Sequence, residues 1–373
     1  MKTIAIHIFK VILKFIYFFL KILPTNKNKI VFISRQTNDI NTDFAMIRDE
    51  IEKRDKNIKM VFLCQRIEKG IRSSIKYSFT ILKQMHALAT SKIAIIDSYC
   101  IPVCILNHKK SLFVLQIWHS IGKIKKSGYQ TLDTPSGRSS KMAKLMCMHQ
   151  NYDKIIAGGP AFDEFYEAGF NVSKDKLLHY GLPRIDYLLD NEKRLKKEIY
   201  EKYPEFKNKK IVYYTPTFRT YEVDGPQKMM EEYSKKDFIL IVRGHPNQRL
   251  DIDYSKVYEC LEFKSTELLT IADYVITDYS SICLEAAILN KKVLFYVYDY
   301  DKYMNENGIN LDAYKVLPSC ASKNIKDIFK IIKTDSYDDK AYQEFRKKYL
   351  PEKLGKSTKL IVDYIIKEMK NSR

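Results

Sequence analysis

Small hydroxyl residues and an aspartate follow an apolar segment at a position suited to binding phosphate. Residues 273–276 (DYVI) are typical of the end of a buried strand, and residues 282–289 (ICLEAAIL) are typical of a helix. The turn between them holds four polar residues: Thr277, Asp278, Ser280 and Ser281. Such a turn offers hydroxyls and backbone N–H groups to a phosphate. We expect the two serines to bind phosphate oxygens, Asp278 to cap the helix and Glu285 to hold ribose hydroxyls. The alternative is a plain helix cap.

A histidine follows a second apolar segment, at residues 112–118 (LFVLQIW). His119 then lies at the carboxyl end of a strand, and Lys123, Lys125 and Lys126 place positive charge near it. A neutral imidazole can take a proton from a hydroxyl near neutral pH. We predict that His119 is a general base. The alternative is a histidine that only bonds backbone groups of its turn.

Two further strand ends carry cationic residues. Arg243 and His245 follow the strand expected at 238–242, and we predict that Arg243 grips a phosphate while His245 assists a departing one. Pro246 stiffens this turn. Thr217 and Arg219 follow the strand expected at 210–215, and Arg184 follows Tyr180-Gly-Leu-Pro. These last residues are weaker candidates, since a proline turn with one arginine is common.

Other signatures of cofactors and metals are weak in this chain. Asp299-Tyr-Asp301 has the spacing of a metal-binding DxD, but it stands alone, and we favour a solvated loop. No P-loop and no GxGxxG occurs, which argues against an ATPase or a dehydrogenase. The seven cysteines form no CxxC pair. We expect Cys64, Cys260 and Cys283 to be buried free thiols in a reducing cytosol.

The charge balance favours an anionic partner. The chain has 64 Lys and Arg against 45 Asp and Glu, a net charge of +19 spread along its length. Membranes, phosphorylated polymers and nucleic acids all attract such a surface. The 27 tyrosines are dispersed and form no compact nucleic-acid module, so we expect no nucleic-acid partner. A lysine-rich solvated surface is the simpler explanation for many individual lysines.

The first residues read as a basic amphipathic helix. Apolar residues recur at helical spacing through residues 2–23, while Lys10, Lys14 and Lys21 lie on one side. Lys10 and Lys14 interrupt the apolar stretch that a spanning helix or a secretory signal needs. We therefore predict a helix that lies in the headgroup region of a membrane. A core helix packed on its own domain and a true membrane span are the alternatives.

Short apolar runs alternate with longer amphipathic ones along the rest of the chain. Nine strands are expected at residues 29–34, 59–64, 92–97, 112–118, 153–157, 210–215, 238–242, 274–277 and 292–297. Near-continuous apolar strands separated by helices indicate parallel sheets covered on both faces. The pattern restarts near residue 210, which predicts two doubly wound α/β domains at 25–195 and 196–373 after the helix at 1–24. We expect the last helix, at 357–370, to pack back on the first domain, with Ser357 as its N-cap.

Several of these pieces occur together, in one order, between about residues 115 and 300. They are Trp118-His119 with its lysine run, Tyr180-Gly-Leu-Pro-Arg184, Thr215-Pro-Thr-Phe-Arg219, Gly244-His245-Pro246 and the turn Thr277-Asp278-Tyr279-Ser280-Ser281. The set resembles the CDP-glycerol glycerophosphotransferases that build teichoic acids. The resemblance implies a GT-B architecture, with two Rossmann-like domains facing a central cleft. It also implies a peripheral position on the cytoplasmic face of the membrane.

The resemblance also implies roles for individual residues. His119 corresponds to the acceptor-side catalytic histidine, His245 with Arg243 to the donor-side pair, and the turn at 277–281 to the diphosphate site. Ser120 departs from the family, because many members have glycine there. The implied reaction moves a polyol phosphate, glycerol phosphate in the first place, from a CDP-activated donor to a hydroxyl of a lipid-linked anionic acceptor. CMP leaves, and no cofactor is implied beyond a divalent cation that the diphosphate could carry.

Two other functions fit part of the same sequence. A GT-B glycosyltransferase with a UDP-sugar donor would use the same fold and the same phosphate turn. A basic binding protein for membrane or nucleic acid would need the charge but not His119. The nucleotide that is released, CMP or UDP, separates the two enzymes.

Overall fold

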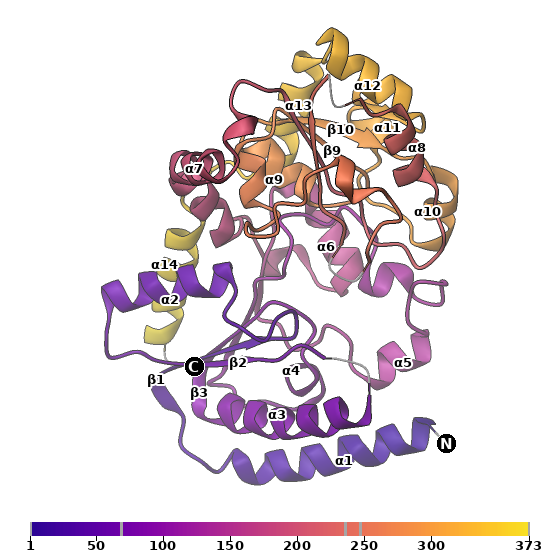
Figure 1. The fold of residues 1–373 in the computed structure, drawn as a ribbon. Helices are drawn as coiled ribbons and strands as arrows, with labels where there is room; N and C mark the ends of the chain where they lie inside the picture. The colour runs from indigo at the N-terminus through magenta and orange to yellow at the C-terminus, as the bar shows by residue number, and fades with distance from the viewer. Residues whose placement is uncertain (1, 68–69, 235–236, 246–247, 372–373) are drawn as a thin grey trace. The chain divides into compact units, whose positions relative to one another are not determined.

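The computed structural model describes residues 2–67, 70–234, 237–245 and 248–371 (Figure 1). It divides into two compact units. The first runs to Ser120 and adds Ser127–Asp186 and the residues from Lys353 onward, and the second comprises Ile121–Lys126 and Tyr187–Glu352. The predicted boundary lay at residues 195 and 196, whereas the second unit begins inside helix α7 (Pro183–Lys202). Pro246 lies outside the described residues.

The first unit is built on a parallel sheet of six strands in the order β2-β1-β3-β4-β5-β6. The strands are β1 (Asn26–Ser34), β2 (Lys59–Cys64), β3 (Ser91–Ile96), β4 (Phe113–Gln116), β5 (Lys154–Ile156) and β6 (Leu177–Leu178). Every residue of β3 and β4 is buried, as expected for strands covered on both faces. All neighbours pair in parallel, so the carboxyl ends of β1, β3 and β4 lie at one edge of the sheet.

Among the described residues, seven α-helices lie wholly within this first unit. They are α1 (Lys2–Leu20), α2 (Thr42–Arg54), α3 (Ile71–Thr90), α4 (Ile101–Ile105), α5 (Ser140–Leu145), α6 (Asp163–Phe170) and α14 (Ser357–Lys370). The last helix packs against α2 and β3 (Figure 1). Its predicted N-cap was wrong, because Ser357 is already its first residue and makes no side-chain cap. Asp186 accepts hydrogen bonds from the backbone N–H groups of Ser357 and Thr358 instead.

Helix α1 packs against α3 through one face and leaves the opposite face uncovered (Figure 1). Leu13 and Tyr17 are buried, and the Tyr17 hydroxyl lies 2.8 Å from Nδ1 of His108. The Lys10 ammonium donates to the Leu145 carbonyl. The uncovered face, called here the α1 apolar face, consists of side chains that are each at least half exposed: Ile4, Ile8, Val11, Ile12, Phe15, Phe18, Phe19 and Ile22.

The second unit contains a parallel sheet of five strands in the order β11-β10-β9-β7-β8. The strands are β7 (Ile211–Tyr214), β8 (Ile239–Val242), β9 (Tyr274–Thr277), β10 (Lys292–Tyr296) and β11 (Ala321–Ser322). Its helices are the remainder of α7 with α8 (Gly225–Glu232), α9 (Ile282–Ile288), α10 (Tyr300–Glu306), α11 (Ala313–Val316), α12 (Ile325–Thr334) and α13 (Asp339–Tyr349). All nine predicted strands are present, and the sequence pattern missed β6 and β11.

A short segment from the first half of the chain is part of the second unit. Lys125 forms an antiparallel bridge with Ile309, and Lys126 N–H donates to the Gly308 carbonyl at 3.2 Å. The Asn310 amide donates to the carbonyls of Lys123 and Lys125, each at 3.1 Å. We call residues Ile121–Lys126 the lysine arm. These bonds fix the arm beside the loop that follows α10.

The cysteines agree in part with prediction. All seven are free thiols. Cys260 and Cys283 are buried as predicted, whereas Cys64 is only half-buried.

Candidate active site

The first unit brings three side chains with polar groups to the carboxyl edge of its sheet. Ser34 ends β1, Asp97 follows β3 and His119 follows β4, and these strands are neighbours in the order β1-β3-β4. His119 Nδ1 lies 3.1 Å from the carbonyl oxygen of Asp97. A carbonyl can only accept, so Nδ1 carries the hydrogen and Nε2 is the acceptor nitrogen of the neutral ring. His119 is therefore held in the tautomer that a base acting through Nε2 requires.

Trp118 supports this histidine with an unusual backbone. Its φ of 60° lies in the left-handed region, which costs a bulky residue about 1–3 kcal/mol. The Trp118 ring lies 4.1 Å from the His119 ring, centre to centre, and also packs on Phe170 at 4.8 Å. Backbone strain of this kind concentrates at functional sites. The left-handed turn ends the strand abruptly, and His119 comes directly after it.

Asp97 is a buried carboxyl that sequence reasoning missed as a candidate. It is 2% exposed, and its Oδ2 accepts from the Ser34 hydroxyl at 2.7 Å and from the Asn41 amide at 3.0 Å. Burial raises its pKa to about 6, and the Ser34 and Ser98 hydroxyls offset part of that rise. The available signal was its place as the last residue of the strand predicted at 92–97. His119 was identified in a similar way, by its place directly after the strand predicted at 112–118.

Arg184, predicted as a substrate cation, is held by a carboxylate of its own unit. Its Nε lies 2.8 Å from Oδ2 of Asp43, its Nη2 donates to the same oxygen, and its backbone N–H donates to Oδ1 at 2.8 Å. Asp43 is 1% exposed. This fork ties the start of α7 to the first turn of α2. The arginine therefore has a structural role here.

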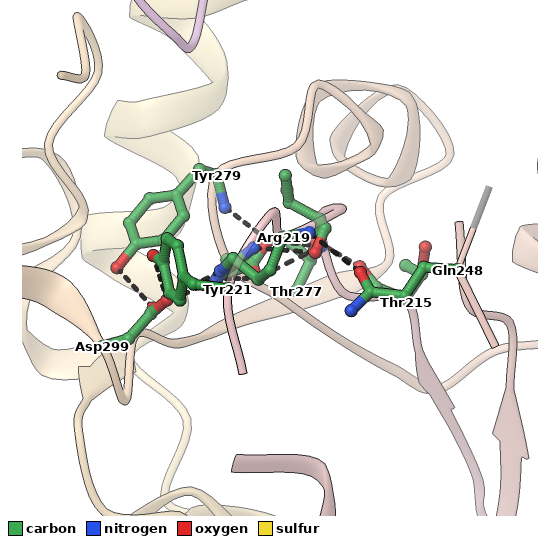
Figure 2. Close-up of polar contacts among 9 residues, drawn as sticks. Thr215, Arg219, Tyr221, Gln248, Thr277, Tyr279 and Asp299 are labelled. Carbon is green, nitrogen blue, oxygen red and sulfur yellow. Dashed lines mark hydrogen bonds and ion pairs between the residues drawn. The ribbon is translucent and has the colours of Figure 1, made fainter. Parts of the chain in front are cut away.

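In the second unit, Arg219 is the centre of a buried polar network (Figure 2). Its Nε donates to Asp299 at 2.6 Å, its Nη2 donates to Asp278 at 2.8 Å, and its Nη1 donates to the Thr217 carbonyl at 2.7 Å. The guanidinium also lies 4.7 Å from the centre of the Tyr303 ring. Burial opposes its charge, but Asp278 and Asp299 raise the pKa of Arg219 above its ordinary value. All three nitrogens are bonded within the protein, and a direct contact of Arg219 with substrate stays a prediction.

Two carboxylates that the sequence suggested for other purposes are engaged in the same way. Asp278 accepts from the backbone N–H groups of Thr217, at 3.0 Å, and Tyr279, at 2.6 Å, and does not cap α9. Asp299 accepts from Arg219 and from the Tyr221 hydroxyl at 2.8 Å (Figure 2). The expected solvated loop was therefore wrong for Asp299. Its neighbour in the DxD, Asp301, lies 2.6 Å from the Lys323 ammonium.

The described residues contain no group of three or more His, Cys, Asp or Glu side chains that could hold a metal ion. The DxD carboxylates meet Arg219 and Lys323 respectively.

The predicted phosphate turn lies directly after β9. Thr277 is fully buried and its hydroxyl donates to the Thr215 carbonyl at 2.8 Å, so it ties two strands together. Ser280 and Ser281 are half-buried, and Ser281 precedes the seven-residue helix α9. Thr217 is buried, and its hydroxyl has no hydrogen-bond partner among the described side chains. Glu285 is 4% exposed within α9, a position that does not favour contact with a ribose.

Arg243 and His245 follow β8 as predicted, but Arg243 has a structural task. Its Nη1 lies within 3.2 Å of three backbone carbonyls, those of Glu259, Cys260 and Phe263. It thereby organises the loop after β8, and its grip on a phosphate stays a prediction. His245 is exposed and its ring lies 5.5 Å from the Phe218 ring.

The lysine arm brings two cations into the second unit. Lys123 is 3% exposed, and burial lowers its pKa to about 7. Burial also lowers the pKa of Lys125 to about 8, while Asp278 raises it and Arg219 lowers it. Lys125 therefore lies within electrostatic range of the turn after β9. The sequence flagged the lysine run as a neighbour of His119 and gave no sign that it would join the second sheet.

A pocket of about 660 Å³ opens in the second unit beside the loops after β7 and β8. Its lining includes Arg219, Tyr221, Gln227, Gln248 and Arg249. Pockets of about 300–1,000 Å³ hold small ligands and cofactors. Loops at the carboxyl ends of parallel strands are where α/β domains bind nucleotides.

Comparison with known proteins places this site in a family. The sequence profile described as CDP-Glycerol:Poly(glycerophosphate) glycerophosphotransferase matches residues 15–367. A teichoic acid poly(ribitol-phosphate) polymerase of Bacillus spizizenii is 30% identical over 94% of this chain, which spans 58% of the polymerase. A teichoic acid ribitol-phosphate primase of the same organism is 28% identical, with 98% of each chain covered. A teichoic acid glycerol-phosphate primase of Bacillus subtilis is 28% identical over 68% of each chain.

Solved structures agree on the fold. The wall teichoic acid polymerase TagF, in its H444N variant, superimposes with a TM-score of 0.73 at 20% identity, over 93% of this chain and 90% of that one. The predicted fold class, two Rossmann-like domains of the GT-B type with an apolar N-terminal helix, is confirmed. The profile match covers nearly the whole chain and includes His119 and the turn after β9. This chain belongs to the CDP-Glycerol:Poly(glycerophosphate) glycerophosphotransferase family.

Proposed function

We propose that this chain transfers a polyol phosphate from a CDP-activated donor to a hydroxyl of a membrane-linked acceptor in teichoic acid or related polymer synthesis, and releases CMP. The observation that carries the proposal is His119, held as the Nδ1–H tautomer by the Asp97 carbonyl, in a chain that matches the family over residues 15–367. Glycerol and ribitol are both candidate polyols, since relatives of this chain are named for each.

In the proposed reaction the acceptor oxygen attacks the phosphorus that carries the polyol. The new P–O bond forms as the P–O bond to CMP breaks, and Nε2 of His119 takes the hydroxyl proton. A positioned base of this kind contributes about 10²- to 10⁴-fold to a rate. Most of the remaining acceleration in phosphoryl transfer comes from positioning and from charge stabilisation.

The donor phosphates are assigned to the turn after β9. Ser280 and Ser281 supply its two half-buried hydroxyls, while the Thr217 hydroxyl is buried. Arg219 is bonded to Asp278 and Asp299. We therefore assign Lys125 of the lysine arm as the cation that binds the donor phosphates. His245 is assigned to the departing CMP because it is exposed at the carboxyl end of β8.

We assign the chain to the cytoplasmic face of the membrane, and the α1 apolar face supports the membrane part of that assignment. Thr3–Leu20 is also long and apolar enough to cross a membrane, but length and composition alone are weak evidence for a spanning helix. The buried contacts of Leu13 and Tyr17 and the Lys10 bond to Leu145 favour a helix that lies along its own domain with the apolar face turned to lipid. The core-helix alternative would bury that face, which is exposed.

The test is a donor panel with the purified full chain and a lipid-like acceptor that ends in glycerol phosphate. CDP-glycerol, CDP-ribitol and UDP-sugars are compared, with released CMP or UDP and product length as readouts. We expect CMP from a CDP-polyol, and loss of at least 100-fold in rate for His119→Ala. His86→Ala, an exposed histidine on α3, is the matched control and should retain activity. UDP release from a sugar donor, or full activity of His119→Ala, would refute the proposal.

A further inference from the structure

Two arginines of the first unit share one tyrosine ring and lack a carboxylate partner. The guanidinium of Arg35 lies 5.6 Å from the centre of the Tyr99 ring, and that of Arg138 lies 5.5 Å from it. Both distances are in the range of cation–π contacts. Within the part of the chain that the structure describes, neither forms an ion pair, whereas Arg184 and Arg219 are each held by buried carboxylates. Two like charges beside one ring repel each other, and a bound anion would offset that repulsion.

This pair is connected to the proposed base by short hydrogen bonds. Arg35 directly follows Ser34, whose hydroxyl donates to the Asp97 carboxyl at 2.7 Å. The Asp97 carbonyl is the group that accepts from His119 Nδ1. Tyr99 comes two residues after Asp97, and its carbonyl accepts from Nη1 of Arg35 at 2.6 Å. These bonds fix Arg35 beside the turn that holds His119, at the carboxyl edge of the first sheet.

The same tyrosine is connected to the helix that carries the α1 apolar face. The Tyr99 hydroxyl donates at 2.8 Å to the carbonyl of Met146, directly after α5. The Lys10 ammonium of α1 donates to the carbonyl of Leu145, the last residue of α5. The end of α5 therefore bonds both α1 and the ring beside the two arginines. An acceptor with its lipid at α1 and its end at His119 would bring its linking phosphates to this part of the unit.

The chemistry of the pair selects the ligand. A guanidinium keeps its charge at any physiological pH, and its planar fork of N–H donors matches the oxygens of a phosphate. Arg138 is an exposed residue and Arg35 is half-buried, so the pair is open to solvent. We propose that Arg138 and Arg35 bind the phosphodiester that precedes the attacking hydroxyl of the acceptor. This inference rests on the proposed function and deepens it, because it names an acceptor that already ends in a polyol phosphate.

Two simpler roles for these arginines would give different results. If Arg138 only stacked on Tyr99, it would stabilise its loop, and its loss would affect a charged and an uncharged acceptor alike. If the basic surface as a whole attracted the acceptor, any exposed cation of the same region would contribute as much as Arg138. The property to measure is therefore the preference for an acceptor phosphate, and its dependence on Arg138 in particular.

The experiment compares two lipid-like acceptors with the purified full chain and the CDP-polyol that it uses. Both end in the same glycerol unit, which is joined through a phosphodiester in one and through an uncharged methylphosphonate in the other. We expect the wild type to favour the phosphodiester by about 10- to 100-fold in kcat/KM, the range of a hydrogen bond between charged groups. Arg138→Gln should reduce this preference to about 3-fold or less and leave the KM for the CDP-polyol unchanged.

A control and a second variant complete the test. Lys141→Gln removes an exposed cation three residues further along, on α5, and should keep the full preference. Arg35→Gln should lose the preference as Arg138→Gln does, and Trp118 fluorescence reports whether each variant is folded.

Three results would overturn the assignment. One is a wild type that uses both acceptors equally well, which leaves the proposed function intact. The others are a folded Arg138→Gln enzyme that keeps the preference or loses activity equally on both acceptors, and a Lys141→Gln enzyme that loses the preference to the same extent. A wild type that releases no CMP with either acceptor and any CDP-polyol overturns the proposed function itself, and this inference with it.

Discussion

Replacing Asp97 by asparagine should make the first unit more stable at neutral pH. Burial is the main cause that raises the pKa of this carboxyl from 3.8 to about 6. The shift is about 2 units, and each unit corresponds to about 1.4 kcal/mol, so ionising Asp97 in the folded state costs about 3 kcal/mol. Asparagine has nearly the same shape and never pays this penalty.

The direction of the pH dependence follows from proton binding. Below about pH 4 the carboxyl is protonated in both the folded and the unfolded chain, and no penalty exists. Between about pH 4 and 6 the folded state binds more protons than the unfolded state, so stability falls as pH rises. Above about pH 6 the penalty is complete. The advantage of Asp97→Asn should therefore be near zero at pH 4 and reach its full size by pH 7.

The single tryptophan gives an assay specific to this unit. Trp118 is the only tryptophan of the chain and lies next to His119, so its fluorescence follows the unfolding of the first unit. A gain of about 3 kcal/mol in a unit of roughly 200 residues raises Tm by about 6–12 °C. The control is Asp49→Asn on α2, an exposed carboxyl whose loss should not stabilise the unit. A lower Tm for Asp97→Asn at pH 7, or an equal shift at pH 5 and pH 8, would refute the reasoning.

The remaining predictions concern the other parts of the molecule. The double variant Phe15→Glu, Phe18→Glu should no longer sediment with phosphatidylglycerol liposomes. The control Leu261→Glu, which changes an equally exposed apolar residue of the second unit, should still sediment. Unchanged sedimentation of the double variant would exclude the α1 apolar face as the anchor. Arg219→Ala leaves two buried carboxylates without their cation and should destabilise the second unit by about 3–5 kcal/mol in urea titrations. A loss below 1 kcal/mol would contradict that structural role. Lys125→Met should raise the KM for the CDP-polyol about 10-fold with little change for Lys126→Met, and equal effects would show a nonspecific loss of charge.

Most strands and the last helix could be predicted from the sequence because their signals are local. The apolar periodicity of residues 357–370 indicates the bounds of helix α14, although its first residue, Ser357, is not the N-cap that was predicted. Strands β6 and β11 have two residues each, too few to show any apolar run. The lysine arm was misplaced for another reason. Its sequence gives no indication that Asn310, nearly 190 residues away, supplies the hydrogen bonds that hold it in the second unit.

The same difference between local signals and long-range contacts decides which site residues could be predicted. His119 was identified because a histidine after an apolar strand must emerge at the carboxyl edge of a parallel sheet, a rule that needs only local sequence. The roles of Arg184 and Arg219 were not accessible in this way. Asp43 lies 141 residues from Arg184, and Asp299 lies 80 residues from Arg219. Only the folded arrangement shows that each arginine already has a buried carboxylate partner.

These pairings change how the net charge of +19 relates to the reaction. An arginine whose nitrogens are all bonded to buried carboxylates adds rigidity to a site and little net attraction for an anion. In the second unit Arg219 holds Asp278 and Asp299 in place, and so fixes the loop after β7 against the turn after β9. The attraction for a diphosphate then has to come from cations without a carboxylate in hydrogen-bond contact. Lys125, with a pKa lowered by burial to about 8, is the described residue of the lysine arm that electrostatics couples to Asp278. A phosphate beside it would favour its charged form, so donor binding and protonation of Lys125 should reinforce each other.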